Sequence, residues 1–217
     1  MNFIETYKCS PDLCEKIIET FESNKSIQVR GMLGYGNEQN ANLKRKNSID
    51  LTIDVDYIKQ IKNWEAIWDY CHFATDCLKK YHNKYFLIKD MADGEYRATN
   101  MVIERYINIQ KYVPPDGGFH QLHFERSNGL ESRELVFMTY LNTIHEGGGT
   151  AFPFQKLKTK PVVGNTIIWP AGFTHRHVGI RAPKETKYII TGWFRLQELT
   201  EEEKKVNPDL EKEIKMT

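Results

Sequence analysis

Long hydrophobic runs are missing from this sequence. No stretch approaches the roughly 18–20 apolar residues that a membrane-spanning helix needs, and the start, MNFIETYK, carries Glu5 and lacks the apolar stretch of a signal peptide. Net charge is also nearly absent, because 30 lysines and arginines stand against 29 acidic residues. We therefore expect a cytosolic protein without membrane association, and the charge indicates no nucleic-acid partner. The sequence gives no indication of oligomeric state.

Cysteine is scarce as well. The four cysteines all lie in the first third of the chain and are spaced too widely for CxxC motifs: Cys9, Cys14, Cys71 and Cys77. They fall in or near predicted helices. Buried free thiols are therefore favoured over a zinc site or a disulfide framework, because free cysteine packs as a small hydrophobic residue.

A length of 217 residues predicts a single domain, residues 1–217. Within it we expect mainly helical support with a loop over residues 1–99, a β-rich core over 100–197 and a peripheral tail over 198–217. The first helix is predicted to begin at Pro11, with Ser10 as its N-cap. A second helical stretch, in one or two pieces, is predicted from about Val55 to Tyr81.

Between the two helices, the segment from Gly31 to Ser48 has many glycines and asparagines and few apolar residues. Such long loops are usually either functional lids or poorly ordered segments, and the sequence leaves both readings open.

After residue 100 the pattern changes to short β-rich runs separated by Gly-, Pro- and Asp-containing turns. This pattern predicts a sandwich or barrel, with the N-terminal helices packed against one face. Six strands are expected: VIERYINIQKY, FHQLHFE, ELVFMTYLN, TIIWP, THRHVGI and KYIITGWF.

His123 and Glu125 stand two residues apart in one predicted strand, so both side chains project from the same face. With His177 they would make a set of two histidines and one carboxylate, which suits Fe(II) with open coordination positions. The His-x-Glu pair alone is a weak signal, because such residues are more often surface or satisfied core residues. A zinc hydrolase would also accept these ligands, but the helical HExxH motif is missing.

Two further questions concern the end of the β region. His175 competes with His177 for the ligand role, because THRH would place both on one strand face, but the ten-residue interval to Lys187 and the following Val-Gly favour His177. Lys187 opens the apolar run KYIITGWF; a buried lysine there requires an anionic partner, such as the far end of a metal-chelating dicarboxylate. The alternative places Lys187 at a strand edge in water. His120 is expected to be a pocket wall or a solvent-facing strand residue.

Four motifs occur in order over roughly residues 106–196: YVPPDGGFHQLHFE, MTYLN, GGGTAFP and HVGIRAPKETKYIITGW. Together they resemble prolyl 4-hydroxylases, a branch of the Fe(II)/2-oxoglutarate-dependent dioxygenases. The resemblance implies an α+β fold, a double-stranded β-helix or jelly-roll barrel buttressed by N-terminal helices. Glu125 departs from the family pattern, which has an aspartate at this position.

The resemblance also implies roles for single residues. His123, Glu125 and His177 would bind Fe(II) and carry the catalytic chemistry, and Lys187 would receive the distal carboxylate of 2-oxoglutarate. Four further residues would complete the pocket: Tyr140 beside that carboxylate, Tyr112 near the metal-chelating end, and Thr191 and Trp193 along the wall.

The implied activity is hydroxylation of an unactivated C–H bond with dioxygen, Fe(II) and 2-oxoglutarate, with ascorbate as a further candidate. The expected substrate is peptidyl proline. A free amino acid or another small molecule is the alternative substrate, and a catalytically silent metal-binding jelly roll is the alternative of another class.

Overall fold

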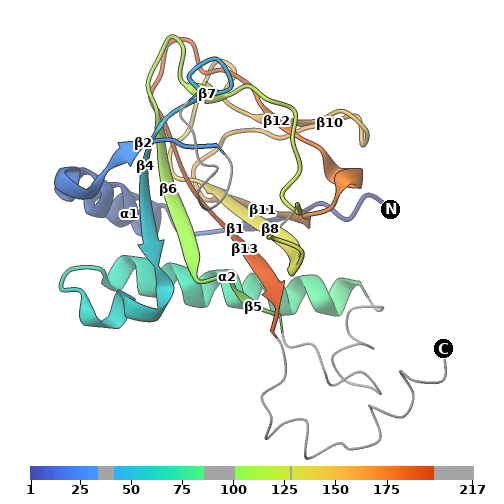
Figure 1. Ribbon diagram of the computed structural model, residues 1–217, viewed down its shortest axis with the longest axis horizontal. Coiled ribbons are helices and arrows are strands. Elements are labelled where there is room, and N and C mark those ends of the chain that lie inside the picture. Colours follow the sequence, from blue (N-terminus) through green and yellow to red (C-terminus); the bar gives the residue numbers. More distant parts are fainter. Residues whose placement is uncertain (34–41, 86–100, 128, 198–217) are drawn as a thin grey trace, which may run out of the picture.

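The computed structural model describes residues 1–33, 42–85, 101–127 and 129–197. Two helices lie beside a large antiparallel sheet, and shorter strands cover the opposite face of that sheet (Figure 1). Helix α1, Pro11–Ser23, begins as predicted, and Ser10 Oγ accepts the backbone N–H of Leu13 at 3.1 Å. The second helical stretch forms in two pieces, a 3-10 helix over Val55–Gln60 and helix α2 over Glu65–Lys84.

The large sheet has eight strands. Seven lie side by side in the order β1 (Glu5–Lys8), β11 (Asn165–Pro170), β8 (Arg133–Tyr140), β13 (Lys187–Leu196), β6 (Tyr106–Tyr112), β4 (Ile49–Asp54) and β2 (Val29–Arg30), and β5 (Met101–Ile103) pairs with the end of β13. Strands β1, β2 and β4 were not predicted, so residues 1–99 supply strands as well as helices. The signal for β4 is the alternation of IDLTID, in which Leu51 and Ile53 are buried in the core beneath the helices.

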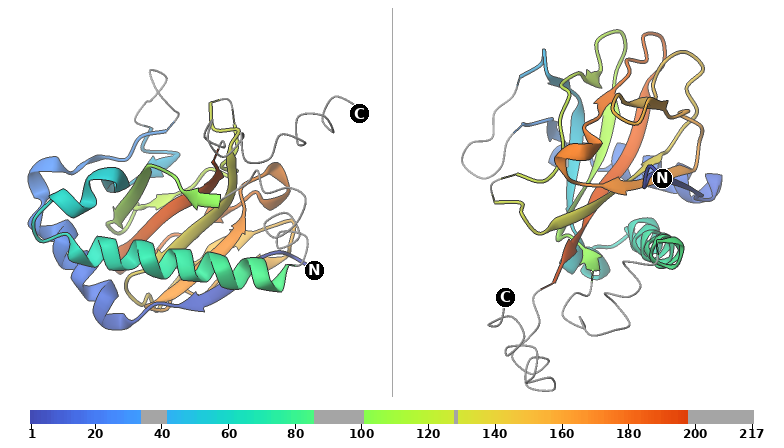
Figure 2. Two further views of the ribbon diagram at one scale, coloured as in Figure 1. Left: turned by 90° about the horizontal axis from the view of Figure 1, so that it is seen from below. Right: turned by 90° about the vertical axis from the view of Figure 1, so that its right-hand side faces the viewer.

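Two smaller sheets complete the architecture. One contains β10 (Leu157–Lys158), β9 (Thr150–Phe152) and β12 (Val178–Gly179), and the other pairs β3 (Lys46–Asn47) with β7 (Gly118–Phe119). Figure 2 shows these elements on the side of the large sheet away from α2. The fold is the α+β double-stranded β-helix that the resemblance implies.

Two predicted strands are wrong for most of their length. In FHQLHFE only Phe119 belongs to a strand, and in THRHVGI only Val178 and Gly179 do, while Phe173–His175 forms a 3-10 turn. For the first of these segments the reason is a contact with a residue distant in the sequence. After one isolated bridge between the two segments, the N–H groups of Glu125 and Arg126 both donate to the carbonyl of Ala171, which turns the chain away from a strand path.

The large sheet separates two apolar clusters because side chains alternate between its faces. On β8, Leu135 and Phe137 pack in the cluster that contains both helices, whereas Val136 and Met138 belong to the cluster on the other face. The helices thus support the sheet from outside. The inner face is left to line a cavity.

The centre of the Gly31–Ser48 loop and the tail 198–217 lie outside the described residues. The described end of the loop contains β3, so that part is strand. All four cysteines are free, and three of them are buried, as predicted. No helix in the described ranges is long and apolar enough to cross a membrane. That residues 1–217 form one domain stays a prediction.

Candidate metal centre and adjoining cavity

His123 and His177 meet in the isolated bridge between two segments far apart in the sequence. The N–H of His123 donates to the carbonyl of His177 at 3.0 Å, and the N–H of His177 returns a bond to His123 at 2.9 Å. Two residues further, the N–H of Glu125 donates to the carbonyl of Ala171 at 3.0 Å, just past the end of β11. Backbone hydrogen bonds therefore fix the position of all three candidate ligands.

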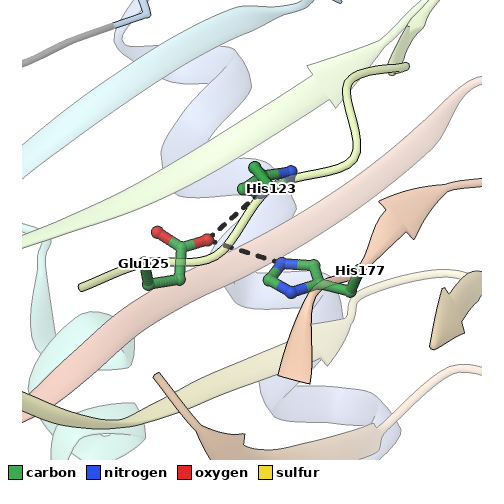
Figure 3. Close-up of side chains that lie close together, drawn as sticks. All are labelled: His123, Glu125 and His177. Atoms are coloured by element: carbon green, nitrogen blue, oxygen red, sulfur yellow. Dashed lines mark ion pairs between the residues drawn. The ribbon is translucent and has the colours of Figure 1, made fainter. Parts of the chain in front are cut away.

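The three side chains converge on one point (Figure 3). Glu125 Oε1 lies 3.2 Å from His123 Nε2 and 3.4 Å from His177 Nε2. The three candidate ligand atoms all lie within 4.8 Å of one another. The structure thus brings together the three residues named from the sequence, although His123 and Glu125 do not lie on a regular strand.

Both imidazole rings are oriented by backbone carbonyl groups. His123 Nδ1 lies 2.7 Å from the carbonyl oxygen of Gln121, and His177 Nδ1 lies 3.1 Å from that of His175. A carbonyl oxygen can only accept, so each Nδ1 carries the proton in these contacts. In a neutral ring, Nε2 then keeps the lone pair that a metal ligand needs. This atom faces the Glu125 carboxylate in both histidines.

Burial and hydrogen bonding set the charges at this point. Burial raises the pKa of the Glu125 carboxyl, but the neighbouring imidazole rings of His123 and His177 outweigh it and hold that pKa well below its usual range. For His177, burial lowers the pKa, and the nearby Glu125 carboxylate opposes this only in part. An ionised carboxylate beside a neutral imidazole is the protonation state that metal binding requires.

His175 is turned away from this centre. It ends the 3-10 turn Phe173–His175, and its Nε2 lies 2.8 Å from the carbonyl oxygen of Asn2. The expectation that His175 and His177 share one strand face is therefore wrong. Of the two histidines, only His177 reaches Glu125.

A cavity of about 1390 Å³ adjoins the three ligands and extends to Lys187, the first residue of β13. Lys187 is buried, and its Nζ donates to the carbonyl oxygen of Gly148 at 3.1 Å and lies 4.7 Å from the centre of the Tyr112 ring. Burial lowers the pKa of Lys187 to about 8. The reading that places Lys187 in water at a strand edge is excluded.

A second buried lysine in the same cavity provides a contrast. Lys46 Nζ pairs with Asp50 Oδ2 at 2.6 Å, so its charge is neutralised within the protein. Among the residues that the structure describes, no carboxylate lies within salt-bridge distance of Lys187. An anionic ligand would supply the missing partner.

The two predicted tyrosines are both buried. Tyr112 pairs with Lys187 across β6 and β13. Its expected place near the metal-chelating end stays a prediction. Its hydroxyl donates to Gln110 at 2.5 Å. Tyr140 is fully buried and its hydroxyl bonds to the hydroxyls of Thr150 and of a threonine on the following loop, at 2.9 and 2.7 Å. Thr150, and not Tyr140, lines the cavity.

Both predicted residues of the last strand line the cavity. The Thr191 hydroxyl donates to a backbone carbonyl of β8 at 3.0 Å. Trp193 also contacts a candidate metal ligand directly, because its indole N–H donates to Glu125 Oε2 at 3.1 Å. His120 is half-buried, outside a strand, and its Nε2 lies 3.1 Å from the carbonyl oxygen of Asp116.

Several cavity residues were not predicted. Trp169 on β11 packs edge-on against His177 with ring centres 5.0 Å apart, and its indole N–H has no partner among the described residues. The period-two alternation of TIIWP, with Ile167 and Trp169 in the inner cluster, is the signal that would have found it. Arg133 and Glu104 also line the cavity, and their residue types gave no signal.

Two imidazole nitrogens and one carboxylate oxygen suit a divalent metal that keeps open positions for other ligands. Among the described residues, a buried lysine without a carboxylate partner and a buried indole N–H without an acceptor lie in the same cavity. The residues therefore fit a metal ion together with an anionic co-ligand.

Sequence comparison agrees with this arrangement. Residues 107–195 match the 2OG-Fe(II) oxygenase superfamily. Prolyl 4-hydroxylase 13 of Arabidopsis thaliana is 28% identical over 124 residues, which cover 47% of this chain and 44% of that protein. The chain thus matches less than half the length of this curated relative.

Solved structures show the same fold at low identity. A Trichoplax adhaerens prolyl hydroxylase in complex with a hypoxia inducible factor peptide fragment has a TM-score of 0.63 at 16% identity, covering 95% of this chain and 88% of that one. A prolyl-4-hydroxylase of Pseudomonas putida has a TM-score of 0.61 at 16% identity, covering 91% and 94% of the two chains. The chain therefore resembles prolyl 4-hydroxylases in sequence and in fold, and its residues 107–195 resemble a 2OG-Fe(II) oxygenase domain.

Proposed function

We propose that this chain is an Fe(II)- and 2-oxoglutarate-dependent dioxygenase that hydroxylates a prolyl residue of a peptide. The observation that carries the proposal is the placement of His123, Glu125 and His177 in one cavity with the buried Lys187. A metal site alone would suit many reactions. The buried ammonium group of Lys187 beside it, which has no carboxylate partner among the described residues, favours an anionic co-substrate.

In this proposal His123, Glu125 and His177 hold Fe(II), and Lys187 binds the distal carboxylate of 2-oxoglutarate. When bound, the iron and 2-oxoglutarate supply the activation of dioxygen. The protein fixes the ligands through the backbone bonds at His123, His177 and Ala171. Apolar inner-face side chains, among them Met138, exclude water from the cavity.

The size and lining of the cavity support a peptide substrate. About 1390 Å³ exceeds the roughly 300–1,000 Å³ of typical small-ligand pockets, so room remains beyond the co-substrate. The wall formed by β4 and β6 is polar, and Thr52 Oγ1 donates to Asn108 Oδ1 at 2.7 Å across the two strands. Amide and hydroxyl groups of this kind suit the main chain of an extended peptide. The Trichoplax relative was solved with a peptide.

The test is succinate release from 2-oxoglutarate, measured with proline-containing peptides, with the same peptides carrying alanine for proline, and with free amino acids. We expect stimulation by the prolyl peptides and a matching mass increase of one oxygen in the peptide. His123→Ala should abolish both signals. Equal turnover with prolyl and alanyl peptides would contradict the prolyl assignment, and stimulation by a free amino acid alone would replace the peptide with a small substrate.

A further inference from the structure

The two carboxylate oxygens of Glu125 have different surroundings. Oε1 faces both imidazole rings, whereas Oε2 points away from them (Figure 3). Oε2 accepts the indole N–H of Trp193 at 3.1 Å and lies 3.8 Å from Nη1 of Arg133. The second oxygen is therefore already engaged by the protein.

Trp193 and Arg133 are themselves held in place. The Arg133 guanidinium lies 3.6 Å from the centre of the Trp193 ring, a stacking distance. Its Nε and Nη2 donate to the two oxygens of Glu104 at 2.6 and 2.8 Å. The N–H of Glu104 in turn donates to the carbonyl of Trp193 at 2.8 Å. Each contact restricts the next, so the indole has little freedom to leave Oε2.

We infer that Trp193, supported by Arg133 and Glu104, is a positioning residue that reserves Oε2 and makes Glu125 a one-oxygen metal ligand. The inference rests on the proposed metal site. Partners in the second coordination shell orient metal ligands, and their loss typically costs about 10- to 100-fold in metal affinity.

The length of the glutamate side chain explains why a hydrogen bond that holds Oε2 matters at this position. Glutamate has one more rotatable bond than aspartate, so its carboxylate is less restricted by the backbone. If both oxygens were free, either or both could approach the ion, and a second bound oxygen would occupy a position that the co-substrate or dioxygen needs. Because Oε2 accepts the indole N–H of Trp193, only Oε1 is free to bind the ion.

The experiment measures Mn(II) binding by titration in an EPR spectrometer, so it does not depend on turnover. Trp193→Phe keeps the ring for Arg133 but removes the N–H, and we expect the dissociation constant for Mn(II) to rise about 10- to 100-fold. The d–d absorption of the Co(II)-loaded variant should also change, since freeing Oε2 alters the coordination number. Trp68→Phe on α2, outside the cavity, is the matched control and should leave both measurements unchanged.

Glu104→Gln provides a second variant that leaves Trp193 and Glu125 intact. It should weaken Mn(II) binding by a smaller factor, because only the support of Arg133 is loosened. Thermal unfolding of the metal-free proteins separates these effects from misfolding. Unchanged Mn(II) affinity and Co(II) spectrum in a folded Trp193→Phe protein would overturn the inference and leave the proposed oxygenase standing. A wild-type protein that binds no Mn(II) would overturn the metal site itself.

Discussion

The ionisation of Lys187 gives the cavity a pH dependence. Burial lowers the pKa of this ammonium group from 10.5 to about 8 in the protein without ligand. Only the protonated form pairs with a carboxylate. The affinity for 2-oxoglutarate should therefore be constant below pH 8 and fall roughly tenfold per pH unit above it, as the free protein loses the proton. Calorimetric titration of the Mn(II)-loaded protein at a series of pH values measures this.

Lys187→Arg is the matched variant for that prediction. An arginine stays charged over the whole range, so the variant should still bind 2-oxoglutarate but without the fall above pH 8. The same decline in both proteins would show that another group titrates. Loss of binding in the arginine variant at every pH would show that the bulkier head group does not fit, and Lys187→Met would then have to lose binding as well.

Most of the candidate centre could be predicted at the level of single residues, because spacing carries information about ligands. His177 and Lys187, ten residues apart, were recognised together, and both line the cavity. The role of Trp193 could not be predicted in the same way. Its bond to Glu125 depends on the packing of two segments 68 residues apart. No local pattern encodes such a contact.

Strand β13 contains a glycine whose lack of a side chain is needed for packing. A Cβ at Gly192 would lie 2.4 Å from Phe137 Cζ and 2.6 Å from Ile107 Cγ2, both buried beneath the helices. Gly192→Ala should therefore lower the free energy of unfolding by about 1–3 kcal/mol through overpacking. Denaturant titration of the purified variant measures the change.

Gly172→Ala is the control for this prediction, because a Cβ there would meet no atom within 4 Å. Its effect should stay within about 0.5 kcal/mol of zero. If both variants had wild-type stability, the close approach of Phe137 to β13 would not be a constraint on the fold.

Elements with strong periodicity were predictable and the short ones were not. Helix α1 has an N-cap, a proline at its first position and an apolar face, and it was predicted to begin at the correct residue. Strands of two or three residues, such as β3 and β12, are too short to show alternation. The segment before His177 forms a 3-10 turn instead of a strand. The segment around His123 reads as a strand but leaves the strand path after one bridge, because the Ala171 carbonyl accepts two of its N–H groups. A contact with a residue so distant in the sequence cannot be predicted from the pattern of neighbouring residues.

For the whole molecule, the order of helices and strands predicted that the N-terminal helices pack against one face of the β-rich core. The outer face packs against α1 and α2 (Figure 2). The inner face carries the centre and its cavity. The size of the cavity was not predictable, because its lining residues come from segments distant in the sequence. The expected cytosolic location stays a prediction.

The account rests on one claim, that the cavity holds Fe(II) and 2-oxoglutarate together. The direct measurement is metal analysis of protein prepared without oxygen, followed by titration with 2-oxoglutarate. We expect one Fe(II) per chain and binding of 2-oxoglutarate that requires both the metal and Lys187, so that His123→Ala and Lys187→Met each lose it. Zinc in place of iron, or iron-loaded protein that does not bind 2-oxoglutarate, would contradict the account.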